Sequence, residues 1–147
     1  MSKLFIYYTN SGNGEVVSKR VRELGADLRR VQPKKDLPKS FLGKMLSGGF
    51  QASVKYKAKL DNFDFDISQY DEIIIGSPIW NGRISSPINS VLGALDLTEK
   101  KVTFILYSAS GKADKSVQRI NKEYPSARVI ILKEPKKYGD ELEKIDI

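Results

Sequence analysis

Short apolar runs rich in β-branched and aromatic residues alternate along the chain with segments whose apolar positions recur every three or four residues. The first pattern predicts buried strands, and the second predicts helices that bury one face. The alternation favours an α/β fold: a three-layer, doubly wound sandwich around a five-stranded parallel sheet. The strands are predicted at 4–8, 26–31, 72–76, 102–107 and 128–132, and the second is expected at an edge because charges interrupt it.

Helical segments follow four of these strands. In the first helix, Val17, Val21 and Leu24 lie four and three residues apart, and Gly25 ends the pattern. Ser86 can cap the next helix, with Pro87 at its first position. The inward-facing residues of the three later helices are predicted to be Ile88, Val91, Leu92 and Leu95, then Val117, Ile120 and Tyr124, and finally Tyr138, Leu142 and Ile145.

Residues 33–70 are the ambiguous part of the pattern, because several glycines and Pro38 interrupt it. The apolar residues within 41–46 could form a short helix. Residues 55–60 alternate like a strand but could equally be an extended loop. We therefore expect a partly ordered excursion over the sheet.

The length of 147 residues suits one domain spanning 1–147. The chain has no cysteine and no histidine, which excludes disulfides, thiolate nucleophiles and the commonest general base. Redox chemistry would therefore need a bound cofactor. The N-terminal apolar stretch is too short for a signal peptide and no apolar run could cross a bilayer, so we expect a cytoplasmic protein with no membrane partner.

The formal net charge is +7, and the excess is local. Seven lysines lie between Lys34 and Lys59, where only Asp36 opposes them. Such a segment could attract nucleic acid or an acidic protein. A solvated surface segment is the favoured interpretation, because the lysines form neither a helical stripe nor a nucleic-acid-binding motif. A nucleic-acid partner is therefore not expected.

Three loops rich in Gly, Ser and Asn follow predicted strands: 9–14, 77–82 and 108–113. In an open parallel sheet the ligand site lies beyond the carboxyl ends of the strands, where the strand order reverses. Small and polar residues allow the backbone to approach a ligand closely. We therefore expect the three loops to form one site.

The first loop combines the start of a helix with the hydroxyls of Thr9 and Ser11. Free backbone N–H groups and the helix dipole favour an anion there. Residues 9–14 contain no lysine or arginine and the Walker pattern is absent, so neutral donors around a single phosphomonoester are favoured. The alternative is that Ser11 or Asn13 only caps the helix.

Trp80 is the only tryptophan, and it follows a predicted buried strand in the loop that also contains Asn81 and Gly82. Its indole could seal the edge of the core or present a flat face to a planar ring. Residues 108–113 could then supply N–H groups to the polar edge of the same ring.

Two segments carry a family resemblance, "YYTNSGNGEVVSKRV" at 7–21 and "YDEIIIGSPIWNGRISSPINSVL" at 70–92. The first resembles the phosphate loop of flavodoxins. The second is similar to the strand-to-helix segment of that family, which contains a Pro-x-Trp-x-Gly pattern. The chain thus looks like a short-chain flavodoxin or flavodoxin-like protein. The resemblance implies strand order 2-1-3-4-5 with FMN at the switch point. It also implies an oxidoreductase of the electron-transport class, which shuttles single electrons between a reductase and acceptor proteins.

The resemblance assigns cofactor contacts by position and implies neither catalytic residues nor metal ligands. The FMN phosphate would lie among Thr9, Asn10, Ser11, Gly12 and Asn13, with Gly14 closing the motif. The isoalloxazine would lie against Pro78, Ile79 and above all Trp80, with the Asn81–Gly82 peptide near flavin N5. Ser108, Ala109, Ser110 and Gly111 would meet the pyrimidine edge.

The chain departs from the family pattern at three points. Gly14 replaces a hydroxyl residue, a loss worth about 1.5 to 3 kcal/mol of phosphate binding, so Gly14→Thr is expected to tighten FMN. No second aromatic is available to stack on the flavin unless Phe50 or Tyr56 folds over. Flavodoxins are typically acidic, so a chain of net charge +7 is expected to have a less negative potential.

Two other functions remain open: an NAD(P)H-dependent FMN or quinone reductase, and a flavin-free module that binds a partner through the lysines of 34–59. No residue suggests a nicotinamide site, and no histidine is available to protonate a quinone. An electron-transfer flavoprotein is therefore favoured over a substrate-specific enzyme.

Overall fold

The computed structural model describes residues 2–33, 60–61 and 66–147. Its main sheet is parallel, with the strands in the order β2-β1-β5-β7-β8. This is the predicted order 2-1-3-4-5, and β2 lies at an edge as expected. The bounds are β1 (Lys3–Tyr7), β2 (Asp27–Arg30), β5 (Glu72–Trp80), β7 (Lys101–Ser108) and β8 (Arg128–Lys133).

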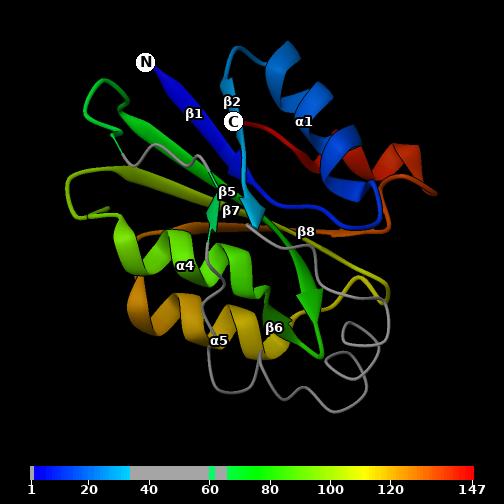
Figure 1. The fold of residues 1–147 in the computed structure, drawn as a ribbon. Coiled ribbons are helices and arrows are strands. Elements are labelled where there is room, and N and C mark those ends of the chain that lie inside the picture. The colour runs from blue at the N-terminus through cyan, green and yellow to red at the C-terminus, as the bar shows by residue number, and fades with distance from the viewer. Residues whose placement is uncertain (1, 34–59, 62–65) are drawn as a thin grey trace.

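Helices cover both faces of the sheet (Figure 1). One face carries α1 (Asn13–Glu23) and the short helix η1 (Gly139–Lys144), and the other carries α4 (Ser86–Ala94) and α5 (Asp114–Glu123). The central strands are therefore buried on both sides, which explains their nearly continuous apolar sequences.

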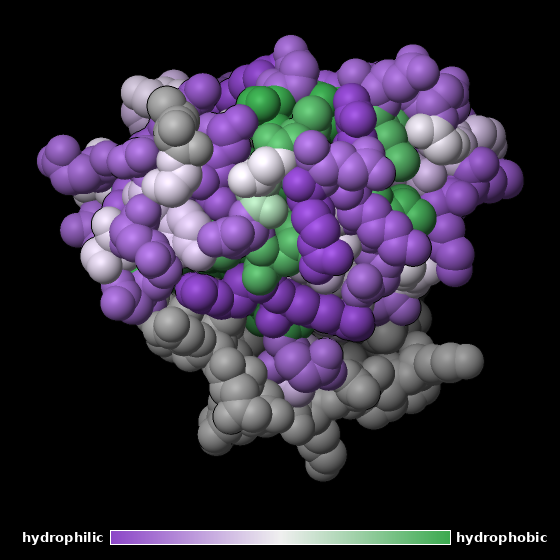
Figure 2. All heavy atoms as spheres, turned by 90° about the horizontal axis from the view of Figure 1, so that it is seen from above, coloured by the Kyte–Doolittle hydropathy of each residue, from purple (hydrophilic) through white to green (hydrophobic). Residues whose placement is uncertain are grey.

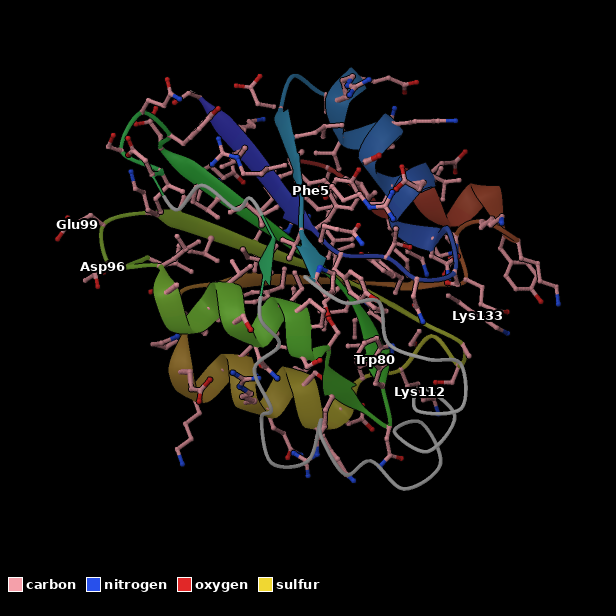
Figure 3. All side chains as sticks on the ribbon, in the orientation of Figure 1. Phe5, Trp80, Asp96, Glu99, Lys112 and Lys133 are labelled. Atoms are coloured by element: carbon pink, nitrogen blue, oxygen red, sulfur yellow. The ribbon has the colours of Figure 1, made fainter. Side chains whose placement is uncertain are left out.

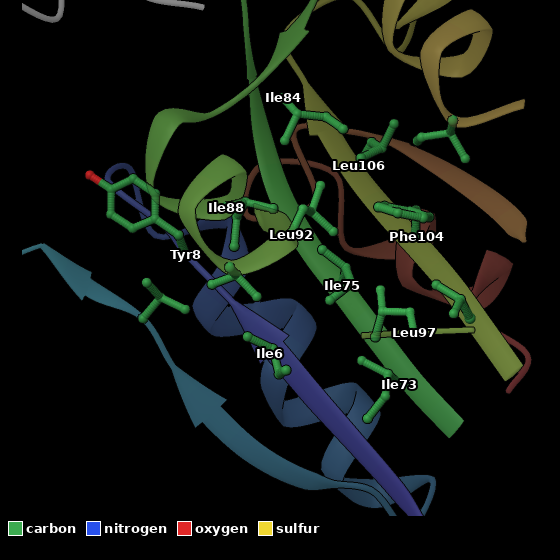
Figure 4. Packing of buried hydrophobic residues seen from close by; sticks show 14 of the residues in the cluster. Ile6, Tyr8, Ile73, Ile75, Ile84, Ile88, Leu92, Leu97, Phe104 and Leu106 are labelled. Carbon is green, nitrogen blue, oxygen red and sulfur yellow. The ribbon is translucent and has the colours of Figure 1, made fainter. Parts of the chain in front are cut away.

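The side chains of β5 alternate between two hydrophobic clusters. Ile73 and Ile75 pack with Ile88 and Leu92 of α4, as Figure 4 shows. Ile74 lies in the other cluster, with Val17 of α1. The helical periods predicted for these two helices are thus confirmed by the burial of their apolar positions.

The strand predicted at 72–76 is longer than expected, because β5 continues through Trp80 and turns back into β6 (Arg83–Ile84). Proline usually ends such a strand, but the position of Pro78 explains the exception. Pairing with β1 ends at Gly76, whose carbonyl accepts a bond from the Tyr8 N–H at 3.1 Å. The nitrogen of Pro78 faces the same side, beyond the end of β1, so its missing N–H leaves no ladder bond unmade.

The predicted last helix is a 3₁₀ helix rather than an α-helix. Leu142 and Ile145 are spaced three residues apart, which matches the three residues per turn of that helix. Tyr138 precedes the helix. The prediction that it faces the core is wrong, since it is 37% exposed. The ammonium groups of Lys133 and Lys137 lie 5.3 and 5.4 Å from the centre of its ring.

Two described parts of the chain within or beside the segment 33–70 lie next to each other. β3 (Gln32–Pro33) pairs antiparallel with β4 (Leu60–Asp61). The predicted short helix at 41–46, the aromatics Phe50 and Tyr56, and the lysines of 34–59 lie outside the described residues.

The surface seen in Figure 2 is mainly hydrophilic, with hydrophobic residues in a limited area. Among the residues that the structure describes, no helix is both long and apolar enough to cross a membrane.

Gly76 provides a test of the packing between β1 and β5. A Cβ atom there would lie 2.5 Å from Cζ of Phe5 and 3.0 Å from Cβ of Tyr7. The Phe5 ring is fixed by stacking on Tyr7, with centroids 5.0 Å apart. Gly76→Ala is therefore expected to lower the free energy of unfolding by about 1 to 3 kcal/mol, measured by urea denaturation.

The control for this experiment is Gly139→Ala, because no atom lies within 4 Å of the added Cβ. That variant is expected to stay within about 0.5 kcal/mol of the wild type. Equal stabilities for the two variants would contradict the close approach of Phe5.

Candidate functional site

The loops after β1, β5 and β7 leave the same edge of the sheet, as predicted (Figure 1). Hydrogen bonds join their bases. The Tyr8 N–H donates to the carbonyl of Gly76, and the hydroxyl of Tyr107, at the end of β7, donates to the carbonyl of Tyr8. The first loop is therefore anchored to both neighbouring loops through the sheet.

Thr9 shapes the first loop from within. Its side chain is buried, and its Oγ1 accepts hydrogen bonds from the N–H groups of Gly12 and Gly14, each at 3.1 Å. Gly12 has φ +94°, a conformation that glycine adopts without strain. The alternative in which Ser11 or Asn13 caps α1 is wrong, since the N-cap residue is Gly12 and the side chain that accepts from the first turn is that of Thr9.

Three N–H groups of the loop have no partner among the described residues, those of Asn10, Ser11 and Asn13. They lie at the N-terminus of α1, where the helix dipole favours negative charge. The loop can therefore accept an anion through neutral donors, as the sequence predicted.

A lysine from a distant segment also reaches this loop. Nζ of Lys136 lies 3.1 Å from the position that a Cβ of Gly12 would occupy, and the Lys136 N–H donates to Oδ1 of Asn13 at 3.0 Å. The charges within 9–14 alone do not predict this residue. The available signal was that β8 ends at the same edge of the sheet and is followed by "EPKKYG" at 134–139.

Gly14 does not have the role expected of it. A Cβ there would lie 2.6 Å from Cβ of Thr9, 2.8 Å from the hydroxyl oxygen of Tyr107 and 3.2 Å from Tyr7. A side chain at residue 14 would thus enter filled space between the loop and the sheet. This crowding argues against the expectation that Gly14→Thr restores a phosphate donor.

Tyr107 fills the space next to Gly14. Burial, and then the neighbouring Tyr7 and Glu15, raise the pKa of Tyr107 well above its usual value. The hydroxyl therefore stays protonated and remains a donor to the carbonyl of Tyr8.

Trp80 seals the edge of the core in this structure. It is 2% exposed, belongs to the cluster beneath α4 and meets the ring of Tyr8 edge to face, with centroids 5.8 Å apart. Of the two interpretations of this indole, the packing one describes the observed arrangement. Stacking on a planar ligand would need a more exposed face of the ring.

The Asn81–Gly82 turn between β5 and β6 has positive φ at both residues, +50° and +78°. This is the geometry that favours Asn-Gly in a two-residue hairpin. The buried Ser77 and Ser85 hydroxyls, 2.9 Å apart, join the base of the hairpin, and Oγ of Ser116 donates to the carbonyl of Gly82 at 2.7 Å. The turn is therefore held in place while Asn81 itself is exposed. The preceding residues Pro78 and Ile79 belong to β5 rather than to a loop.

The third loop begins with a buried hydroxyl that has no partner. Oγ of Ser108 is inaccessible and makes no hydrogen bond within the described ranges. Ala109 and Ser110 are exposed, and Gly111 has φ +77°. An unpaired buried hydroxyl is unfavourable, so a polar ligand beside Ser108 would stabilise this loop.

The profile of the Flavodoxin family matches residues 2–145. This chain belongs to the flavodoxin family. No curated protein sequence matches it. The membership agrees with the strand order and with the three loops at the carboxyl edge.

Solved structures support the fold of this family member. A Bacteroides eggerthii DSM 20697 protein assigned to the flavoproteins has a TM-score of 0.74 at 21% identity, covering 97% of this chain and 98% of that one. A Lactobacillus acidophilus NCFM flavoprotein in complex with FMN has a TM-score of 0.67 at 23% identity, covering 95% and 97%. The apo form of the flavoprotein from that organism is 26% identical with a TM-score of 0.60, covering 88% of each chain.

The space at Gly14 can be tested directly. Gly14→Thr is expected to lower the free energy of unfolding by about 2 to 3 kcal/mol, because the new side chain overlaps Thr9 and Tyr107. The measurement is a denaturant titration. Asn10→Thr places the same side chain at an exposed position of this loop and is expected to cost less than about 0.5 kcal/mol. A stable Gly14→Thr protein with tighter flavin binding would favour the original expectation.

Proposed function

We propose that this flavodoxin-family protein binds FMN and carries single electrons between a reductase and acceptor proteins. The observation that carries the proposal is the set of N–H groups at Asn10, Ser11 and Asn13, on both sides of Gly12, that have no partner among the described residues. When bound, FMN supplies one-electron redox chemistry. The chain has no cysteine, so its own side chains offer no thiol redox chemistry. The FMN present in the Lactobacillus relative supports the choice of flavin.

The phosphate end of FMN fits the first loop. The N–H groups of Asn10, Ser11 and Asn13 would bind the phosphate oxygens, and the Thr9 hydroxyl would hold the loop rather than bind the ligand. The missing Cβ at Gly12 lets the side chain of Lys136 approach the backbone on that side. Together these features suit one phosphate group.

The ring end fits in part. Ser108 has a hydroxyl without a partner among the described residues, but its oxygen is inaccessible and would have to become exposed to meet a polar edge of the ring. The exposed Asn81 lies in the turn after β5. The proposed contacts of Ala109, Ser110 and Gly111 stay predictions. Trp80 would stack on the flavin only if its buried indole became exposed.

Binding of FMN is tested with two glycine-to-alanine variants that strain the backbone to a similar degree, because both glycines have a similar positive φ. Gly12 and Gly25 have φ +94° and +96°, but only a Cβ at Gly12 enters the proposed phosphate site. The wild type is expected to bind FMN with a micromolar or lower Kd, measured by visible absorption and by the quenching of flavin fluorescence. Gly12→Ala should weaken FMN at least tenfold, whereas Gly25→Ala should leave the affinity unchanged.

Two results would overturn parts of the proposal. A wild type that does not bind FMN would contradict the cofactor assignment. If the protein oxidised NAD(P)H with a quinone in the steady state, the FMN assignment would stand, but the protein would be a reductase and not an electron carrier.

The charges around the site allow a prediction about its potential. Lysine side chains approach the three positive-φ glycines of the loops: Lys136 at Gly12, Lys115 at Gly82 and Lys133 at Gly111. Figure 3 shows Lys112 and Lys133 at the end of the sheet near Trp80, with Asp96 and Glu99 at the opposite end. The lysine side chains beside the three loops favour added negative charge at the site.

We therefore expect the more negative of the flavin's two one-electron potentials to lie above that of an acidic flavodoxin titrated under the same conditions. Lys115→Gln should lower it, and Lys19→Gln, on the exposed surface of α1, should not. The difference should shrink as ionic strength rises. A potential at or below that of the acidic protein would contradict this account.

A further inference from the structure

Among the described residues, Lys136 differs from the lysines around it in having no partner for its charge. The ammonium groups of Lys133 and Lys137 lie over the ring of Tyr138, and that of Lys144 forms an ion pair with Glu141 at 2.6 Å. Within the part of the chain that the structure describes, no carboxylate pairs with Lys136.

The side chain of Lys136 is nevertheless held against the first loop. Its Cδ and Nζ atoms each lie 3.1 Å from the Cβ position of Gly12. This proximity is possible because residue 12 has no side chain. An ammonium group beside three N–H groups without partners adds to their positive potential, and no carboxylate of the described residues is paired with it.

Asn13 positions the segment that carries this lysine. Its Oδ1 accepts the bond from the Lys136 N–H at 3.0 Å, and its Nδ2 donates to Oγ of Ser11 at 3.2 Å. One side chain therefore links the loop after β1 to a residue 123 positions later in the chain. The bond places the backbone of Lys136 beside the loop, and from there its exposed side chain reaches Gly12.

We propose that Lys136 is the phosphate-selecting residue of the site and makes the protein discriminate FMN from riboflavin. This inference rests on the proposed function, because it names the residue that recognises the phosphate of the same ligand. A phosphomonoester carries close to two negative charges at neutral pH, whereas riboflavin offers a neutral hydroxyl at that position. The ammonium therefore stabilises bound FMN and contributes nothing comparable to riboflavin.

The test is a fluorescence titration of the full-length apoprotein with FMN and with riboflavin. Lys136→Gln is expected to weaken FMN about tenfold and to change riboflavin affinity by less than about twofold. Lys136→Arg should keep most of the FMN affinity, since it keeps the charge. Lys137→Gln is the matched control, because it removes the adjacent charge, which lies over Tyr138, and should change neither affinity.

Salt adds a second readout. The FMN affinity of the wild type should fall as ionic strength rises, and Lys136→Gln should show a weaker dependence. A purely structural role for the lysine stem would not change this slope.

Three outcomes would overturn the inference. Equal losses of FMN and riboflavin affinity in Lys136→Gln would show that the lysine only packs the loop. Unchanged FMN affinity would show that its charge does not reach the phosphate. If the wild type binds neither flavin, the proposed function fails separately, and the probe becomes inorganic phosphate: an increase in Tm in the wild type but not in Lys136→Gln supports the inference, and no increase overturns it.

Discussion

The buried hydroxyl of Tyr107 connects the sheet to the loop that follows β1, and the shape of this loop depends on it. The hydroxyl donates to the carbonyl of Tyr8, and its oxygen lies 2.8 Å from the place where a Cβ of Gly14 would be. Helix α1 can therefore begin close to β1 only with glycine at residue 14. That proximity brings the Gly14 N–H within 3.1 Å of the Thr9 hydroxyl oxygen.

This arrangement satisfies the inner donors of the loop and leaves the outer ones open. Thr9 engages the N–H groups of Gly12 and Gly14, while those of Asn10, Ser11 and Asn13 have no partner within the described structure. A loop ordered by its own hydrogen bonds loses little conformational entropy when a ligand binds. The affinity of such a loop thus depends on bonds that the ligand never touches.

The sequence predicted the sheet well because apolar runs and helical periods are local signals. It missed the continuation of β5 past Pro78, since the tolerance of that proline depends on where a neighbouring strand ends. It also misjudged Gly14 and could not decide between the two interpretations of Trp80. In both cases an aromatic side chain distant in the sequence occupies the neighbouring space: Tyr107 of β7 beside Gly14, and Tyr8, just after β1, beside Trp80. The positions of the loops were thus predictable, whereas the volumes available inside them were not.

The charge of the site follows the same logic. The first two loops contain no lysine in 9–14 or 77–82, yet lysine side chains lie against their glycines. At Gly12 the approach of Nζ of Lys136 to 3.1 Å depends on the missing Cβ, so a glycine that sets a turn also admits a charge from a later segment. A phosphate loop of neutral residues can therefore belong to a positively charged site, and its motif alone does not reveal the electrostatics. Within one family, the same neutral motif can then hold its ligand at different potentials, according to what the segment after the last strand carries.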